Sequence, residues 1–97
     1  MIASFGDKDT QKLAEGKPVA RFRSIAAQAR RRLYFLELAR TVEHLAIPRG
    51  NRLEKLGGHR EGQWSIRIND RWRICLEWHR DGAYGVQIVD YHRERMR

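Results

Sequence analysis

Apolar and polar residues alternate with a period of two through residues 63–78. Alternation of this kind places successive side chains on opposite faces of an extended strand and predicts a half-buried antiparallel sheet. Asn69 and Asp70 interrupt the pattern and predict a tight turn between two strands, the second of which begins at Arg71. One face of this hairpin is then apolar, with Trp64, Ile66, Ile68, Trp72, Ile74, Leu76 and Trp78, and the other carries Gln63, Ser65, Arg67, Arg71, Arg73, Cys75 and Glu77.

A third strand is predicted over residues 84–91, after a turn at residues 80–82. Its faces are less distinct than those of the hairpin, so the sequence does not show which side of the cluster Asp90-Tyr91-His92 meets the arginine-bearing face. The tail formed by residues 93–97 is expected to be frayed. The two faces of the third strand would carry Val86 and Ile88 with Tyr84 and Asp90, and Gln87 and Val89 with Tyr91.

Helical spacing replaces the alternation over residues 23–39, where apolar residues recur every three or four positions. This spacing predicts an amphipathic helix whose apolar stripe lies on the sheet. A shorter helix is expected at residues 11–15, capped by Asp9 or Thr10 and ended by Gly16 and Pro18. Residues 1–5 are expected to form an edge strand, and residues 41–50 a connection with one helical turn at residues 42–45. The apolar stripe of the longer helix consists of Ile25, Ala26, Ala29, Leu33 and Leu36.

The chain of 97 residues is long enough for one domain with a single modest core, and we expect residues 1–97 to form it. Cys75 is the one cysteine of the sequence and cannot form an internal disulfide, so its apolar neighbours indicate a small packed residue. The sequence shows no signal-peptide core and no apolar run of the ~20 residues that span a membrane. A cytoplasmic protein is therefore expected.

The net charge of +8 adds a candidate partner to this picture. Sixteen of the twenty cationic side chains are arginines, whose planar guanidinium groups bind phosphate in a bidentate way and stack on bases. A strongly basic surface of this kind is typical of a protein that binds nucleic acid. The alternative is a solvated basic surface without a specific partner.

Candidate groups for RNA cleavage are present on the polar face. Cleavage that uses the 2′-hydroxyl as nucleophile needs a base, an acid for the departing 5′-oxygen and a cation that stabilises the phosphorane between them. Arg73 is the candidate cation, and His92 is a candidate acid or base assisted by Asp90 or Tyr91, because histidine is the usual proton-transfer residue near neutral pH. The second proton-transfer group would come from Glu54, Lys55 or His59, and the candidates for binding RNA are Arg67, Arg71, Lys55, His59 and Arg60.

Arg73 and His92 could instead have roles unrelated to RNA cleavage. Arg73 could form a cross-strand ion pair with Glu77 or Asp90, and His92 could be a solvated residue near the chain end. No metal or cofactor is expected, because the histidines are scattered without a ligand spacing and no second cysteine assists them. The glycine-rich residues 57–62 lack the Gly-Lys-Ser/Thr ending of a nucleotide-binding P-loop.

Three segments together carry a resemblance to a known family. Residues 50–54 (GNRLE), residues 62–74 (GQWSIRINDRWRI) and residues 89–92 (VDYH), with the start MIASF and Asp7-Lys8, closely resemble the HigB type of plasmid-maintenance killer toxin in the RelE/ParE superfamily. The resemblance covers nearly the whole chain and implies an α+β fold of the RelE-like, microbial-ribonuclease-like kind, with two N-terminal helices packed on an antiparallel sheet. It also implies a metal-independent toxin that cleaves mRNA in the ribosomal A site.

The resemblance further implies active-site roles for Arg73, Asp90, Tyr91 and His92. Some relatives carry a histidine at the position of Glu54 and a lysine at that of residue 57, so the identity of the base stays open. The implied partner is a HigA-like helix-turn-helix antitoxin, through which alone the complex would contact DNA, and no membrane is involved. Two alternatives are a non-enzymatic inhibitor of DNA gyrase, as in the ParE branch, and a weakly catalytic relative that binds RNA or the antitoxin.

Overall fold

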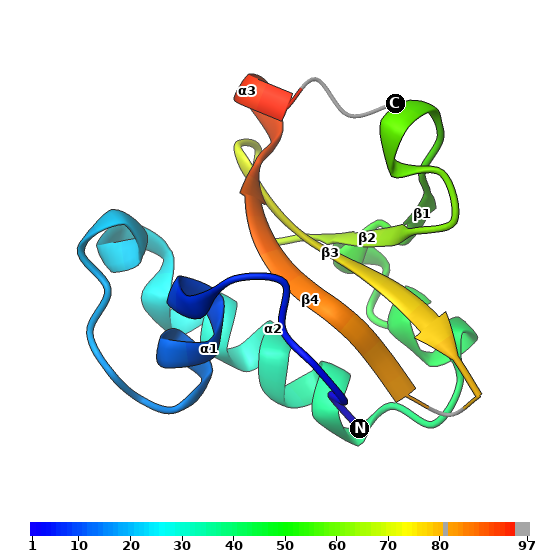
Figure 1. Ribbon diagram of the computed structural model, residues 1–97, viewed down its shortest axis with the longest axis horizontal. Coiled ribbons are helices and arrows are strands. Elements are labelled where there is room, and N and C mark those ends of the chain that lie inside the picture. The colour runs from blue at the N-terminus through cyan, green and yellow to red at the C-terminus, as the bar shows by residue number, and fades with distance from the viewer. Residues whose placement is uncertain (81, 95–97) are drawn as a thin grey trace.

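Two helices lie on one face of an antiparallel sheet in the computed structural model, which describes residues 1–80 and 82–94 (Figure 1). Within these residues the sheet has four strands in sequence order, each paired with the next. The predicted α+β fold with two N-terminal helices is confirmed. The elements are α1 (Lys8–Ala14), η1 (Ala20–Ile25), α2 (Ala26–Leu38), η2 (Val42–Ala46), η3 (Arg49–Asn51), β1 (Glu54–Lys55), η4 (Gly58–Arg60), β2 (Trp64–Arg67), β3 (Trp72–His79), β4 (Gly82–Asp90) and α3 (Tyr91–Glu94), where η marks a 3₁₀ helix.

The first helix, α1, begins at Lys8, earlier than the predicted start at residue 11. Its cap is Asp7, whose carboxylate accepts a hydrogen bond from the Thr10 N–H at 2.7 Å. Thr10 is fully buried and has another role, because its hydroxyl accepts a hydrogen bond from the backbone N–H of Ile88 in β4 at 3.0 Å. The predicted cap at Asp9 or Thr10 is therefore wrong, and Thr10 instead connects α1 to the sheet.

The amphipathic helix predicted over residues 23–39 is divided into η1 and α2. Ile25 adopts φ −118° and ψ 5°, which lies outside the α-helical region, so the regular helix begins only at Ala26. It ends at Leu38, as the spacing predicted to within one residue. The helical turn expected at residues 42–45 is confirmed as η2. The predicted apolar stripe packs on the sheet, with Ile25, Ala29, Leu33 and Leu36 buried and Ala26 partly buried.

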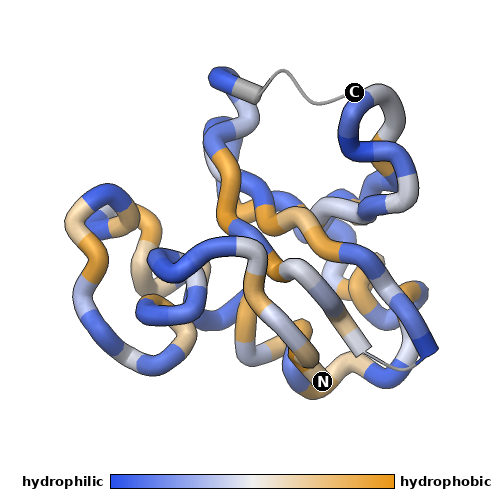
Figure 2. Tube along the Cα trace, viewed as in Figure 1, coloured by the Kyte–Doolittle hydropathy of each residue, from blue (hydrophilic) through white to orange (hydrophobic). Residues whose placement is uncertain are grey.

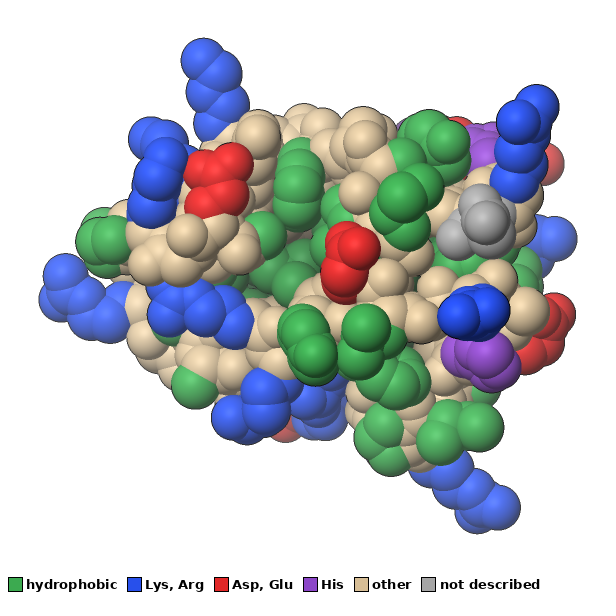
Figure 3. Space-filling view, turned by 90° about the horizontal axis from the view of Figure 1, so that it is seen from below, with side chains coloured by type: hydrophobic (Ala, Val, Ile, Leu, Met, Phe, Trp, Pro, Cys, Tyr) green, Lys and Arg blue, Asp and Glu red, His purple; other side chains and the backbone are tan. Residues whose placement is uncertain are grey.

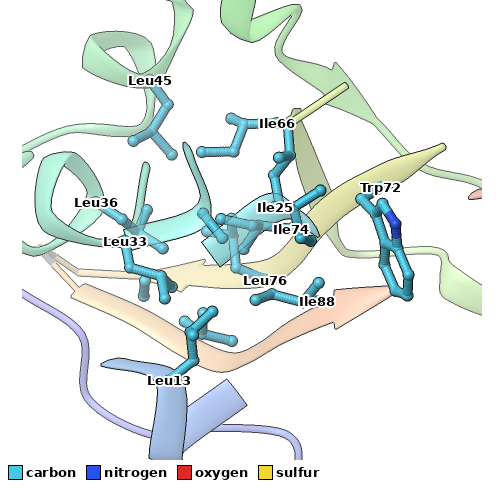
Figure 4. Close-up of a cluster of buried hydrophobic side chains, with 14 of the residues drawn as sticks. Leu13, Ile25, Leu33, Leu36, Leu45, Ile66, Trp72, Ile74, Leu76 and Ile88 are labelled. Atoms are coloured by element: carbon cyan, nitrogen blue, oxygen red, sulfur yellow. The ribbon is translucent and has the colours of Figure 1, made fainter. Parts of the chain in front are cut away.

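Strand register confirms the apolar face predicted for the hairpin. Ile66 pairs with Ile74, and Ile74 pairs with Ile88, so an apolar row crosses β2, β3 and β4 on the side of the helices. Figure 4 shows these side chains meeting leucines from α1, α2 and η2, and Figure 2 shows the apolar stretches of β3 and β4 crossing the middle of the molecule. Trp72 is 8% exposed in this core and Trp64 and Trp78 pack against it, which confirms the core role predicted for the tryptophans.

The opposite face of the sheet carries the residues that alternate with this core. Cys75 is fully buried on this face, as predicted, and forms a second small cluster with Leu56 and Val89, against which Tyr91 packs. We refer to this surface as the arginine face. It consists of two neighbouring cross-strand rows, Ser65-Cys75-Gln87 and Arg67-Arg73-Val89.

The N-terminal segment lies beside β4 and runs parallel to it (Figure 1). Ile2 bridges to Ala83 and Phe5 to Val86, and the Ala3 N–H donates to the Ala83 carbonyl oxygen at 2.7 Å. The edge strand expected at residues 1–5 is thus present as two isolated bridges. These bridges cover the edge of β4 that β3 leaves open.

A short helix follows β4 and begins at the residue where the predicted third strand ends. The strand ends at Asp90, and Tyr91 begins α3, which also contains Arg93 of the tail predicted to be frayed. Residues 95–97 of that tail lie outside the described residues, as does Asp81 of the turn predicted at residues 80–82. None of the helices in the described ranges has the length and apolar character required to cross a membrane.

A hollow opens between α1, α2 and the N-terminal segment on the face seen in Figure 3. Apolar side chains such as Ile2, Phe5 and Leu33 line it. Arg30, which also lines it, donates hydrogen bonds to the carbonyl oxygens of Leu13 and Lys17, both at 3.1 Å. Arg30 therefore joins α2 to the end of α1, which is a structural role for one arginine of the basic helix.

Candidate active site

The guanidinium of Arg73 is fixed on the arginine face by groups from two other segments. Its Nε donates to the Ser65 hydroxyl on β2 at 2.8 Å, and its Nη2 donates to the carbonyl oxygen of Arg52 at 2.6 Å. Nη1 donates to no group within residues 1–80 and 82–93. The side chain is only 7% exposed, so its orientation is determined by these contacts. Alternation placed Arg73 and Ser65 on one face. It did not indicate that the Ser65 hydroxyl and the Arg52 carbonyl oxygen accept hydrogen bonds from Arg73.

The Arg52 carbonyl reaches Arg73 because Arg52 has a left-handed backbone conformation, with φ 45° and ψ 62°. This conformation is uncommon for a residue with a side chain and persists where surrounding contacts maintain it. Asn51 provides such contacts, since it is 1% exposed and its Nδ2 donates to the carbonyl oxygens of Leu45 and Ile47 at 3.2 and 3.4 Å. The GNRLE segment therefore presents a backbone acceptor to the buried arginine.

Arg73 lies between a carboxylate and an aromatic ring. Glu54 Oε1 is 3.7 Å from Nη2 on one side, and the Tyr91 ring centroid is 5.7 Å from Cζ on the other. Burial lowers the pKa of Arg73, while Glu54 and Tyr91 act in the opposite direction. An arginine remains protonated at neutral pH because its ordinary pKa is so high. The site thus contains a permanent positive charge in surroundings that screen it less than bulk water does.

Asp90 organises the start of α3. Its Oδ1 accepts hydrogen bonds from the backbone N–H groups of His92 and Arg93 at 3.1 and 3.3 Å, and its Oδ2 accepts one from Arg71 Nε at 2.9 Å. Desolvation raises the pKa of this carboxyl, but the hydrogen bonds from Arg71 and from the backbone of α3 outweigh it and hold the pKa below its usual range. Asp90 therefore fixes the helix that carries His92, and it pairs with Arg71 instead of Arg73.

Asp90→Asn is expected to remove a pH-dependent part of the stability. Because the pKa of Asp90 is lowered in the folded chain, the ionised carboxylate stabilises the fold above the ordinary pKa of about 4. That contribution is lost as the pH falls through the lowered folded-state pKa. Urea unfolding at a series of pH values should show the wild-type protein more stable than the variant at neutral pH, with a difference that shrinks in acid. A difference that is the same at all pH values would contradict this account.

His92 and Arg67 lie at the same end of the arginine face as Arg73. Arg67 pairs with Arg73 in the strand register, and its guanidinium forms an ion pair with Asp70 in the turn. This ion pair lowers the pKa of the Asp70 carboxyl, and the nearby His92 lowers the same pKa to a smaller extent. The exposed His92 ring has its centroid 6.4 Å from that of Tyr91. The structure thus brings Glu54, Arg73, Tyr91 and His92 together in one row of neighbouring groups.

Other candidates from the sequence lie apart from Arg73. Lys55 pairs with Trp64 in the register and its Nζ is 5.6 Å from the Trp64 ring, on the face opposite Arg73. His59 and Arg60 belong to η4, and Arg60 contacts side chains of β4 and of the segment before β2. The roles predicted for Lys55, His59 and Arg60 in RNA binding stay predictions.

The remaining histidines have local partners. His79 Nε2 lies 2.8 Å from Glu77 Oε1, so the predicted alternative pairing of Glu77 with Arg73 is not formed. His44 Nδ1 accepts a hydrogen bond from the Arg40 N–H at 3.4 Å. In the part of the chain that the structure describes, no three His, Cys, Asp or Glu side chains gather closely enough to hold a metal ion.

Comparison with known proteins identifies the family. The sequence pattern of the RelE-like toxin of the type II toxin-antitoxin system HigB matches residues 4–92, which contain the entire sheet and every candidate site residue. The chain belongs to this HigB-like toxin family. The resemblance found in the sequence is thereby confirmed.

Two curated relatives share parts of this HigB-like chain. Toxin HigB-1 of Vibrio cholerae serotype O1 (strain ATCC 39315 / El Tor Inaba N16961) is 38% identical over 63 residues, and Endoribonuclease HigB of Proteus vulgaris is 42% identical over 41 residues. The matches cover 65% and 42% of this chain. They span 65% of the length of the Vibrio protein and 45% of the length of the Proteus protein.

Proposed function

We propose that this HigB-like protein is a toxin that acts as an endoribonuclease on mRNA. The observation that supports this activity best is the position of Arg73, a fixed cation with a carboxylate on one side and the Tyr91-His92 pair on the other. A phosphodiester placed against Arg73 would have proton-transfer groups on both sides. The Proteus relative, which is named an endoribonuclease, agrees with this activity.

The proposed reaction uses the 2′-hydroxyl of the RNA as nucleophile and needs no metal ion. Arg73 binds the scissile phosphate through Nη1 and stabilises the phosphorane, whose charge grows in the transition state. Glu54 removes the proton from the 2′-hydroxyl, the 2′-oxygen attacks phosphorus, and the bond to the 5′-oxygen breaks. His92 protonates that departing oxygen. The products are a 2′,3′-cyclic phosphate and a 5′-hydroxyl end.

Geometry favours Glu54 over Lys55 as the base. Glu54 pairs with Ser65 in the register and shares the face of Arg73, whereas Lys55 lies over Trp64 on the other face. Asp90 acts through α3 as a positioning residue for His92. The exposed Arg71, which holds Asp90, and Arg67 lie at the same end of the face and are proposed to bind the flanking RNA backbone.

The biological partners follow from the family and from the charge. We propose an antitoxin of the HigA-like helix-turn-helix kind, through which the complex would contact DNA, and mRNA on the ribosome as the substrate. The net charge of +8 favours approach to ribosomal RNA and mRNA, and it predicts binding that weakens as salt rises. The proposed action on mRNA and ribosomes implies a cytoplasmic location.

Mapping of mRNA 5′ ends after a brief pulse of expression in a bacterium tests this proposal. We expect new 5′-hydroxyl ends confined to translated regions of mRNA, because cleavage is proposed to occur on the ribosome. A parallel culture in which translation initiation is blocked before the pulse should lack these ends. Growth arrest with intact mRNA and blocked DNA replication would contradict the proposal and indicate inhibition of gyrase instead.

A further inference from the structure

A second polar cluster lies on the arginine face, around Arg60 of η4. Arg60 Nη1 donates to Gln63 Oε1 at 3.0 Å and to Gln87 Oε1 at 3.4 Å. Gln63 precedes β2 and Gln87 lies in β4, so one guanidinium joins three separate segments of the chain. All three side chains belong to half-buried residues. The catalytic roles proposed above make no use of this cluster.

Strand register places the cluster close to Arg73. Gln87 pairs with Cys75, in the row next to that of Arg73 and Val89. Residues two positions apart on one strand share a face and are separated by about 7 Å. Gln63 shares the face of Ser65 for the same reason. Cys75 and Val89, which are buried, belong to the same two rows as Gln87 and Arg73.

The orientation of both amides follows from their common partner. A guanidinium has donors and no acceptors, so the oxygens of Gln63 and Gln87 must face Arg60. The amide nitrogens are then left as donors. Neither Nε2 donates to a group within residues 1–80 and 82–93. Half-buried donors of fixed direction are suited to a planar ligand that carries acceptors at its edge.

We propose that Gln63 and Gln87, held by Arg60, recognise the base of the nucleotide whose phosphate binds Arg73. The inference rests on the proposed ribonuclease function, and it assigns base selection to side chains other than those of the cleavage reaction. With its phosphate on Arg73, a nucleotide has its base near the two amides, because Gln87 lies in the row next to that of Arg73. Two neighbouring NH₂ donors fit guanine, which presents O6 and N7 as adjacent acceptors, better than adenine, which presents a donor beside an acceptor.

The test is the base composition at the cuts. mRNA 5′ ends are mapped for the wild-type protein and for Gln87→Leu, Gln63→Leu and the control Gln28→Leu, whose glutamine is exposed on α2. We expect the wild-type cuts to be enriched in guanine next to the cut, and each of the first two variants to lose about 10-fold of that enrichment while still cutting. Gln28→Leu should match the wild-type protein in both respects.

Each result separates the inference from the proposed function on which it rests. Unchanged base frequencies in Gln87→Leu and Gln63→Leu would overturn the inference while leaving the endoribonuclease function intact, as would enrichment in adenine in the wild-type cuts. Loss of all cutting in a variant whose thermal unfolding matches that of the wild-type protein would also overturn it, because the residue would then belong to catalysis. Absence of cuts with the wild-type protein would overturn the proposed function itself.

Discussion

Arg73→Ala is expected to lower the rate of mRNA cleavage by about 100- to 1,000-fold, the usual cost of losing one preorganised group that stabilises transition-state charge. The guanidinium that would bind the phosphate is held in place by Ser65 and by the Arg52 carbonyl. The neighbouring Arg67 and Arg71 are paired with Asp70 and Asp90, so neither is placed to replace it. The rate is measured on a defined mRNA in a reconstituted translation system.

Two further variants make this result specific to the guanidinium. Arg73→Lys keeps the charge but cannot contact Ser65, the Arg52 carbonyl and a phosphate at once, so most of the loss should remain. Arg23→Ala removes an exposed arginine from η1 and should retain the wild-type rate. Cleavage by folded Arg73→Ala at the wild-type rate would refute the assignment of Arg73 to the phosphate.

Phe22→Ala is expected to destabilise the fold by about 3–5 kcal/mol, the range measured when a large buried aromatic side chain is truncated. Phe22 is fully buried in η1, and its ring meets that of Trp72 edge to face with the centroids 5.5 Å apart. A domain of this size has a total stability of about 5–15 kcal/mol, so the variant would lose a large share of it. The free energy of unfolding is measured by urea titration.

Tyr34→Ala is the matched control for Phe22→Ala. Tyr34 is an aromatic residue of α2 that is 67% exposed, and its truncation should change stability by less than about 0.5 kcal/mol. Equal losses in the two variants would show that the contact of Phe22 with Trp72 does not anchor the helical layer to the sheet.

The sequence predicted those parts of the fold that depend on periodicity. Alternation identified both faces of β2 and β3, and it separated Val86 and Ile88 from Gln87 and Val89 in β4. The predicted grouping of Tyr84 with Val86 and Ile88 is wrong, because the register shifts between Cys75 and Glu77 and Tyr84 pairs with Glu77 on the other face. Helical spacing identified the apolar stripe of α2 in the same way, because the buried positions recur along the whole helix. The grouping of Arg73 with Ser65 on one face also followed from alternation.

Features decided by a single local contact could not be predicted in this way. Asp7, Asp9 and Thr10 are all residue types that cap helices, and only the tertiary contact of Thr10 with Ile88 shows why Asp7 is the cap. The two-residue strand β1 is too short to show a period, yet its register brings Glu54 to the face of Arg73.

The site depends on such contacts more than the fold does. The Arg52 carbonyl is a backbone group that no side-chain pattern marks, and its direction follows from an uncommon backbone conformation. Likewise, an aspartate at position 90 is compatible with the end of a strand and with the cap of a helix, so the residue type does not distinguish the two. The sequence therefore predicted that Arg73, Asp90 and His92 would be near one another, but not that Asp90 would hold α3.

The parallel pairing of the N-terminal segment with β4 bears on how the protein is made. The Gly85 N–H donates to the hydroxyl of Ser4, which lies 81 positions earlier in the chain. Contacts so distant in sequence form late in folding, because a long loop must close first. Residues 1–6 leave the ribosomal tunnel long before β4, so on a nascent chain their hydrogen-bonding groups have no strand to join. Tyr91 and His92 follow β4, and so the chain can neither close its sheet nor assemble its proposed catalytic groups until β4 has been synthesised.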